Sequence, residues 1–109
     1  MPNNEWSFID ENKIKDYLLN INHDLGKYKA KYFLAFNFSN DNIEEFKDAL
    51  IQHSRDREIY KESNNDYGTK YELRCDIITP DSRNPCIVTV WIIEKGRKEP
   101  KLITAYPNG

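Results

Sequence analysis

Hydrophobic residues recur every three or four positions through the first half of the chain, which is the spacing of amphipathic helices. Asp10 is a suitable N-cap for a first helix that runs to about Asn20. A second helix is predicted from about Leu25 to Phe36, and residues 41–44 resemble a capping box that starts a third helix ending near Arg55. In the first helix the face expected to be buried is Ile14, Tyr17, Leu18 and Ile21. In the second it is Tyr28 or Ala30, then Tyr32 or Phe33, then Phe36. In the third it is Ile43, Phe46 and Leu50.

From Arg57 onward the hydrophobic period changes to two, which indicates β-strands. Strands are predicted over residues 58–63, 69–78, 87–94 and 100–106, with a turn at 64–66, a proline-containing loop at 80–85 and a hairpin turn at 95–98. The fold class is therefore α+β, with three N-terminal helices followed by a four-stranded antiparallel sheet. We expect helices on one face of the sheet and a functional site on the other, partly open face.

The chain of 109 residues is expected to form a single domain, in which residues 1–9 are a flexible N-terminus. An aromatic content of 13% excludes disorder as the main description, and no segment approaches the roughly 20 apolar residues of a membrane helix. The polar N-terminus has no features of a secretory signal, so a cytoplasmic location is expected. Because the net charge is −2, any binding of nucleic acid would depend on a local basic patch.

The two cysteines, Cys75 and Cys86, are too few for a disulfide scaffold and do not have the spacing of a metal site. A turn at residues 81–83 would pair Cys86 with about Ile78 rather than with Cys75, so we expect two reduced thiols. The sequence also has no glycine-rich phosphate loop and no nucleophile elbow. We therefore expect neither a metal nor another cofactor.

His23 is the first candidate for chemistry, because it precedes the predicted second helix. An imidazole at a helix N-terminus lies near exposed N–H groups that bind anions, so it suits a general base facing a phosphate. Lys27 and Lys31 share one helix face close to His23 and would form a phosphate cradle, whereas Lys29 points elsewhere by helical spacing. The alternatives are a loop histidine that donates to a backbone carbonyl and a solvated lysine face.

Hydroxyl groups on the predicted strands could complete such a site. Thr89 shares a face of the third strand with Trp91, and Thr104 shares a face of the last strand with Tyr106. Together these hydroxyls would surround one phosphate, although cross-strand packing alone also explains them.

The start of the second strand and the end of the third helix offer further candidates. Gly68 would permit a bulge that turns Thr69 and Lys70 toward the open face, although a glycine is also ordinary at a hairpin entry. His53 is expected only to interact with the end of its own helix.

A longer series of short motifs runs along the chain, from residue 13 to residue 107. These motifs are KIxxYLL at 13–19, HxxGxxKAxYF at 23–33, FNF at 36–38, YGTKY at 67–71, TVW at 89–91 and TAYP at 104–107. This series resembles a bacterial toxin-like domain family, found as a small protein encoded beside a short partner or as the tail of polymorphic toxins. In architecture it resembles the barnase–EndoU–colicin–RelE group of metal-independent ribonucleases.

The resemblance implies a set of functional positions. It gives weight to Lys29, against the argument from helical spacing. It also differs at one place, since Val88 stands where the family commonly has an arginine, and a phosphate-binding charge is thereby lost. The positions that it carries over are His23, Lys29, Thr69, Thr89, Thr104 and Tyr106.

The main hypothesis is therefore a toxin of a toxin–antitoxin-type pair that cleaves RNA without a metal, with RNA and a small antitoxin protein as partners. His23 would take the proton of a ribose 2′-hydroxyl, which attacks the adjacent phosphorus and gives a 2′,3′-cyclic phosphate. Thr104 and Tyr106 would act with His23 in catalysis. The substrate would be bound by Lys27, Lys29, Lys31, Thr69, Lys70 and Thr89.

A second hypothesis is a non-catalytic module that docks a protein partner through the open face of its sheet. Exposed Trp91, Tyr106 and Tyr67 would be its anchors, because aromatic side chains dominate such interfaces.

Overall fold

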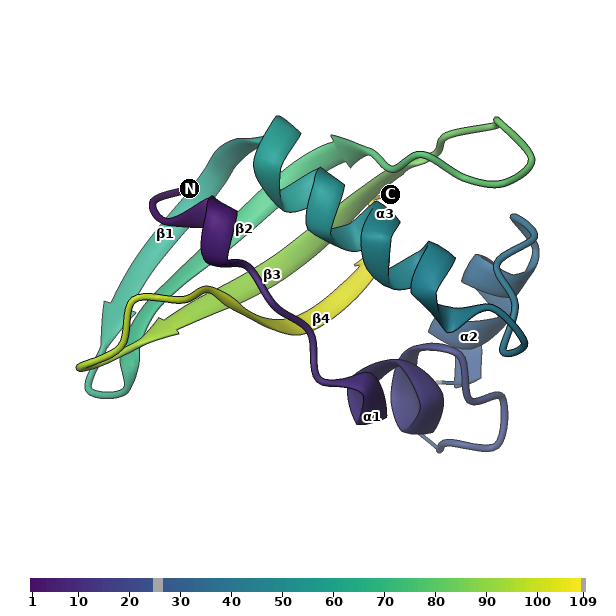
Figure 1. The fold of residues 1–109 in the computed structure, drawn as a ribbon, viewed down its shortest axis with the longest axis horizontal. Helices are drawn as coiled ribbons and strands as arrows, with labels where there is room; N and C mark the ends of the chain where they lie inside the picture. Colours follow the sequence, from purple (N-terminus) through teal and green to yellow (C-terminus); the bar gives the residue numbers. More distant parts are fainter. Residues whose placement is uncertain (25–26, 109) are drawn as a thin grey trace.

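The computed structural model describes residues 1–24 and 27–108, which form a four-stranded antiparallel sheet with helices packed against it (Figure 1). The strands follow one another in chain order as β1-β2-β3-β4. They comprise β1 (Glu58–Asn65), β2 (Gly68–Asp76), β3 (Cys86–Glu94) and β4 (Lys101–Pro107). The helical elements are η1 (Asn4–Trp6), α1 (Glu11–Lys13), which continues into the π-helical η2 (Ile14–Leu18), α2 (Lys27–Leu34) and α3 (Ile43–Asp56). The predicted α+β fold is confirmed.

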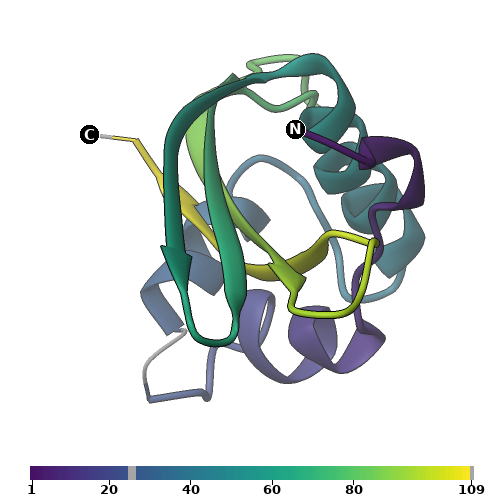
Figure 2. The ribbon, with the colours of Figure 1, turned by 90° about the vertical axis from the view of Figure 1, so that its left-hand side faces the viewer.

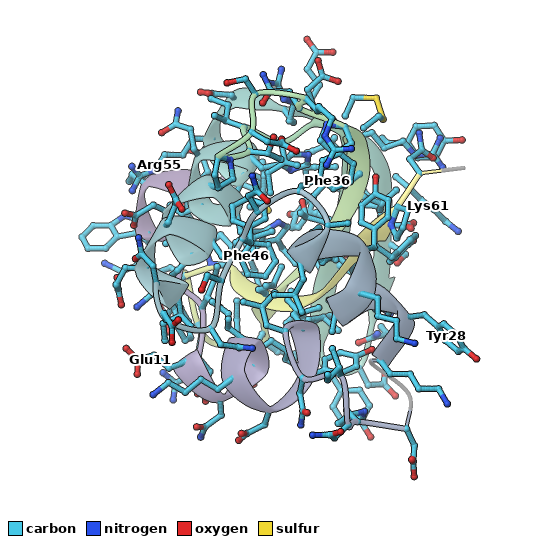
Figure 3. All side chains as sticks on the ribbon, turned by 90° about the vertical axis from the view of Figure 1, so that its right-hand side faces the viewer. Glu11, Tyr28, Phe36, Phe46, Arg55 and Lys61 are labelled. Carbon is cyan, nitrogen blue, oxygen red and sulfur yellow. A yellow bond between two sulfur atoms is a disulfide. The ribbon has the colours of Figure 1, made fainter. Side chains whose placement is uncertain are left out.

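The hydrophobic core lies between α3 and the sheet. Phe46 and Leu50 are one turn apart on α3 and are fully buried, as are Leu73 on β2 and Trp91 on β3. Figure 3 shows Phe46 directed into the molecule, whereas Tyr28 on α2 points away from it. Full burial of such side chains contributes about 1.5–3 kcal/mol each. This packing fixes which face of the sheet is covered by α3 (Figure 2).

The ends of the helices test the predicted caps. Asp10 is the N-cap of α1, since its Oδ1 accepts a hydrogen bond of 3.0 Å from the backbone N–H of Asn12. α3 begins at Ile43 and ends at Asp56, as predicted, but its N-cap Asn42 makes no side-chain capping bond with any described residue, so the predicted capping box is not found. The predicted start of the second helix at Leu25 lies outside the described residues. From Lys27 on, Ala30 and Phe33 form the buried face of α2.

The first nine residues are expected to be flexible from their composition, but the structure packs them against the sheet. Phe8 N–H donates to the carbonyl of Pro100, and Leu102 N–H donates to the carbonyl of Phe8. Ile9 is buried in the core. The segment therefore acts as an additional partner of β4.

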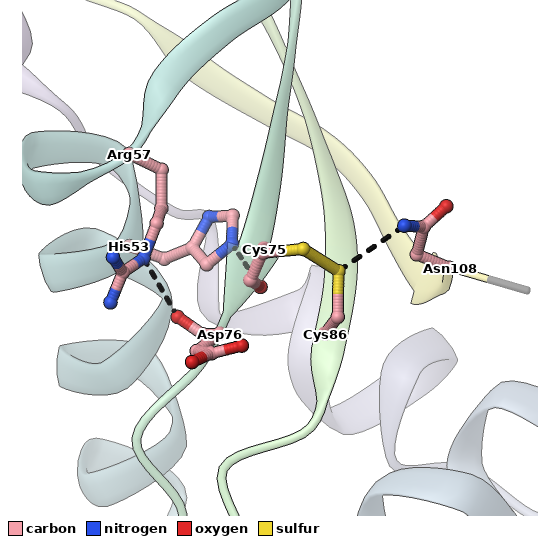
Figure 4. Close-up of a disulfide and its surroundings, with 6 residues drawn as sticks. All are labelled: His53, Arg57, Cys75, Asp76, Cys86 and Asn108. Carbon is pink, nitrogen blue, oxygen red and sulfur yellow. Dashed lines mark hydrogen bonds between the residues drawn. A yellow bond between two sulfur atoms is a disulfide. The ribbon is translucent and has the colours of Figure 1, made fainter.

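A disulfide joins Cys75 and Cys86, so the prediction of two reduced thiols is wrong (Figure 4). Asp76 pairs with Cys86, which places the centre of the connecting loop at Asp81. The predicted pairing of Cys86 with Ile78 requires a loop centred one residue later. That difference displaces the register by two residues, and the true register brings the two cysteine Cα atoms to 4.1 Å.

Candidate functional site

Two rows of side chains cross the face of the sheet opposite α3, and we call this surface the open face. Because side chains alternate along each strand, the strand register decides which residues meet there. One row is formed by Arg74, Val88 and Tyr106, and the next by Glu72, Val90 and Thr104. The two valines are buried, so they form an apolar floor between polar groups contributed by β2 and β4.

Lys29 reaches this face from α2. Its Nζ donates to the Tyr17 hydroxyl at 2.6 Å and to Thr104 Oγ1 at 3.0 Å, and it lies 5.8 Å from the centre of the Tyr106 ring. A single ammonium group thus connects η2, α2 and β4. The prediction from helical spacing that Lys29 points elsewhere is wrong, because Ala30 and Phe33 anchor α2 so that its flank, with Lys29, lies beside β4.

The other two lysines of α2 do not join Lys29. Lys31 is exposed, and Lys27 lies with its Nζ 5.2 Å from the centre of the neighbouring Tyr28 ring. Tyr28 itself is 71% exposed. The expected cradle of Lys27 and Lys31 is therefore directed to solvent.

Tyr17 is a functional candidate that the sequence reasoning missed. Burial on its own would raise the pKa of the Tyr17 hydroxyl, but hydrogen bonds from Lys29 and Thr104, with the positive charges of Lys29 and Lys13, bring the pKa below its ordinary value. Such a hydroxyl gives up its proton more readily than an ordinary tyrosine. The available signal was a hydroxyl-bearing ring within an otherwise aliphatic helix stripe, one turn after Lys13.

His23 lies beside Tyr17, with their ring centres 4.9 Å apart. Its side chain is half-buried, and its backbone carbonyl accepts the N–H of Lys27 at 2.9 Å at the start of α2. The imidazole also borders a groove that continues along β4 through Leu102 and Ile103. His23, Tyr17, Lys29 and Thr104 therefore form one group, which we call the Lys29 cluster.

A second cation stands in the neighbouring row of the open face. The Arg74 guanidinium lies 3.5 Å from the centre of the Tyr60 ring, and Arg74 Nε is buried without a hydrogen-bond partner among the described residues. Arg74 is the cross-strand neighbour of Val88. The charge that the family resemblance places at position 88 is thus supplied to the same face by the adjacent strand.

Tyr106 lies between the two cations. Its hydroxyl donates to Glu72 Oε1 at 3.2 Å. Burial and the Glu72 carboxylate raise the pKa of Tyr106, against a smaller opposing effect of Arg74. Tyr106 therefore keeps its proton, and an anion on the open face would accept that proton only in place of Glu72.

Thr89 belongs to the opposite face, so its predicted grouping with Thr104 and Tyr106 is not found. Thr89 is directly paired with Ala105, on the side packed against α3, and it is fully buried. Trp91 is also fully buried, and its Nε1–H donates to Thr89 Oγ1 at 2.9 Å. The expectation of an exposed Trp91 anchor is wrong.

His53 is a core residue rather than only a partner of its own helix end. Its Nδ1 lies 2.9 Å from Thr89 Oγ1, and its Nε2 lies 2.9 Å from the carbonyl oxygen of Cys75 (Figure 4). Burial lowers the pKa of His53 to about 4. The imidazole is therefore neutral at pH 7 and serves the packing of α3 on the sheet.

The start of β2 does not contain the expected bulge. Gly68 pairs regularly with Glu94, and the irregular step between β1 and β2 lies at Ile59 and Lys61. Gly68 is required for another reason, because a Cβ at this position would lie 2.2 Å from the carbonyl oxygen of Ile93. Thr69, which pairs with Asn64 of β1, donates from its hydroxyl to Asn64 Oδ1 at 2.6 Å. Lys70 is on the open face but at the far end of the hairpin from Arg74.

The sequence matches a family described as a domain of unknown function, DUF6883, over residues 1–109. The chain belongs to this family. No curated protein matches its sequence significantly. A solved chain from a contact-dependent growth inhibition toxin–immunity protein complex of Klebsiella pneumoniae 342 is similar to this DUF6883 domain, with a TM-score of 0.76, 20% identity and coverage of 97% of each chain. At that identity the similarity establishes a shared fold.

Two further findings concern membrane-spanning helices and groups of metal ligands in the described parts of this DUF6883 domain. Within residues 1–24 and 27–108, no helix has the length and apolar character needed to cross a membrane. In the same ranges, no three or more His, Cys, Asp or Glu side chains are grouped so that they could hold a metal ion.

Proposed function

We propose that this chain is the toxin of a toxin–antitoxin-type pair and cleaves RNA as a metal-independent endoribonuclease. The observation that carries the proposal is the position of the Lys29 ammonium, hydrogen-bonded to both Tyr17 and Thr104 on the open face, with His23 against the Tyr17 ring. A cation held by two hydroxyls is suited to the non-bridging oxygens of a phosphodiester. The fold shared with one chain of a toxin–immunity complex supports a role in a pair of this kind.

In the proposed reaction, His23 takes the proton of the ribose 2′-hydroxyl, whose oxygen attacks the adjacent phosphorus. The bond from phosphorus to the 5′-oxygen of the next nucleotide breaks, and Tyr17 donates its proton to that leaving oxygen. Lys29 stabilises the Tyr17 phenolate that remains and, with Thr104 and Tyr106, the charge on the phosphoryl oxygens. The products are a 2′,3′-cyclic phosphate and a free 5′-hydroxyl. Because the nucleophile belongs to the substrate, this route needs no metal-bound water.

Substrate binding is proposed to extend beyond Lys29 to the second cation of the open face. Tyr106 is near both cations, since Lys29 Nζ lies 5.8 Å from the centre of its ring and the charge of Arg74 acts on its hydroxyl. Two cations on this face supply the local basic patch that the net charge of −2 makes necessary. We propose RNA as the substrate, a small protein as the inhibitor, and the cytoplasm as the place of action. Burial of Trp91 removes one of the three expected anchors of the alternative, a non-catalytic docking module, whereas Tyr67 is exposed.

Expression in bacteria tests this proposal at the level of the cell. Wild-type protein is expected to arrest growth, and His23→Ala is expected to relieve the arrest while the purified variant keeps its fold. Lys31→Ala is the control, because Lys31 lies on the same helix as Lys29 but its side chain is exposed. Growth arrest that persists undiminished in His23→Ala would remove His23 from the mechanism.

A further inference from the structure

A groove of about 690 Å³ adjoins the Lys29 cluster, and apart from Tyr17 and His23 its lining residues have no role in the chemistry proposed above. The helical segment with Asp16 and Tyr17 forms one wall, and the end of β3 with the start of β4 forms the other. Its volume is within the roughly 300–1,000 Å³ of ordinary small-molecule sites. Tyr17 belongs to both places, since its hydroxyl binds Lys29 and its ring lines the groove. A ligand in the groove is therefore in direct continuity with a phosphate at Lys29.

The shape of the lining suits a flat, partly apolar ligand. Ile92 and Ile103 contribute aliphatic surface, and the Tyr17 and His23 rings lie beside it. Ile103 is the extra residue at an irregular step in the pairing of β3 with β4. Such bulges commonly redirect side chains next to functional sites. Unstacked nucleobases are bound in this way, between aromatic and aliphatic side chains.

The charge of the groove selects against a second phosphate. Its lining contains three carboxylates and two lysines, so it is acidic overall. Asp10 is engaged as the N-cap of α1. The carboxylates of Asp16 and Glu94 make no ion pair with any other described residue. These two carboxylates can therefore accept hydrogen bonds from the N–H groups of a neutral ligand.

The pattern of donors on each base decides which base fits. Guanine presents two adjacent N–H donors on its Watson–Crick edge, and one carboxylate accepts both. In adenine and cytosine the amino group stands next to an acceptor nitrogen, and in uracil the single N–H stands between two carbonyl oxygens. A carboxylate repels those acceptors, so guanine gains most from the groove.

We propose that this groove binds a guanine base of the RNA, next to the phosphodiester held by Lys29. The proposal rests on the proposed ribonuclease function and adds to it a substrate class, RNA cleaved beside an unstacked guanine. Asp16 and Glu94 recognise the base, and the Tyr17 ring joins the base site to the reacting phosphate.

Titration of the four nucleoside 3′-monophosphates into ¹⁵N-labelled wild-type protein tests the base site without any cleavage. Guanosine 3′-monophosphate is expected to bind at least about tenfold more tightly than the uridine compound, since hydrogen bonds to a charged group contribute about 1.5–3 kcal/mol. The largest amide shifts are expected at Asp16, Glu94 and Ile103. The double variant Asp16→Asn/Glu94→Gln is expected to lose the preference, and Asp66→Asn, an exposed carboxylate in the β1–β2 turn, is expected to keep it. Equal affinity for all four nucleotides, or shifts confined to other parts of the chain, would overturn the proposal.

Sequencing of RNA fragments produced by the wild-type protein separates this proposal from the function on which it rests. Cleavage without base preference, together with unshifted groove amides, refutes the guanine site and leaves the ribonuclease standing. Selective binding of guanosine 3′-monophosphate by a protein that cleaves no RNA refutes the ribonuclease and leaves the guanine site standing. Cleavage beside guanine that the double variant makes unselective supports both.

Discussion

Acid is expected to destabilise the fold through one buried histidine, His53. Trp91 Nε1–H donates to Thr89 Oγ1, so the Thr89 hydroxyl proton is directed to His53 Nδ1, and His53 Nε2–H donates to the carbonyl of Cys75. Nδ1 thus accepts a hydrogen bond only in the neutral state, whereas Nε2–H keeps its bond in both states. Protonation would place a second N–H against Thr89 and a charge in the core, where His53 is 2% exposed.

The size of the effect follows from the pKa of His53, which burial lowers from 6.5 to about 4. Between these two values the unfolded chain binds a proton on His53 and the native protein does not. The stabilisation is therefore complete above pH 6.5 and is lost as the pH falls toward 4. At about 1.4 kcal/mol for each pKa unit, the loss is about 3 kcal/mol of unfolding free energy.

Urea unfolding of wild-type protein and His53→Gln at pH 7, 6, 5 and 4.5 isolates this contribution. Carboxylates titrate equally in both proteins. One of them is Asp81, whose pKa desolvation alone would raise but which hydrogen bonds from Thr79 and Arg83 bring below its ordinary value. The wild type is expected to lose about 2 kcal/mol more than the variant between pH 7 and 4.5. Profiles that run parallel within about 0.5 kcal/mol would refute the assignment of a neutral, buried His53.

Further variants test the packing, the disulfide and the site. Gly68→Ala is expected to lower the unfolding free energy in urea by about 3 kcal/mol or more, because its Cβ would meet the Ile93 carbonyl. The control Gly96→Ala has φ at +83° but open space around the added methyl, so it is expected to lower this free energy by about 1 kcal/mol. Equal losses in the two variants would contradict the close approach at Gly68. Reduction of the disulfide between residues 75 and 86 is expected to lower the unfolding free energy by about 2–3 kcal/mol, and an unchanged urea midpoint in dithiothreitol would contradict its presence. Tyr17→Phe keeps the ring against His23 and is expected to lower the rate of RNA cleavage about 100-fold, while an unchanged rate would exclude its hydroxyl as the proton donor.

The helices and strands of this fold could be predicted from the sequence, because the period at which hydrophobic residues recur is a local property. The spacing of Ile43, Phe46 and Leu50 is that of one helix face, and the alternation of residues 69–78 predicts a half-buried strand. Asp10 could be assigned as a cap because its hydrogen bond spans only two residues. The order of the strands also followed, since short connections join neighbouring antiparallel strands.

The candidate site could be predicted only in part from the sequence, because it depends on the register of one strand relative to the next. Alternation places Thr89 with Trp91 and Thr104 with Tyr106, but it does not state whether the two pairs share a face. The register pairs Val90 with Thr104 and so separates them. The same lack of register concealed the disulfide, and helical spacing alone could not show that a lysine on the flank of α2 reaches β4.

End-group analysis of cleaved RNA tests the central claim most directly. Purified wild-type protein is incubated with total RNA in the presence of a chelator, and the new 3′ ends are examined. We expect 2′,3′-cyclic phosphate ends, reduced at least about 100-fold in Lys29→Ala and unchanged in Lys31→Ala. Intact RNA with wild-type protein, or equal cleavage by Lys29→Ala, would contradict the claim.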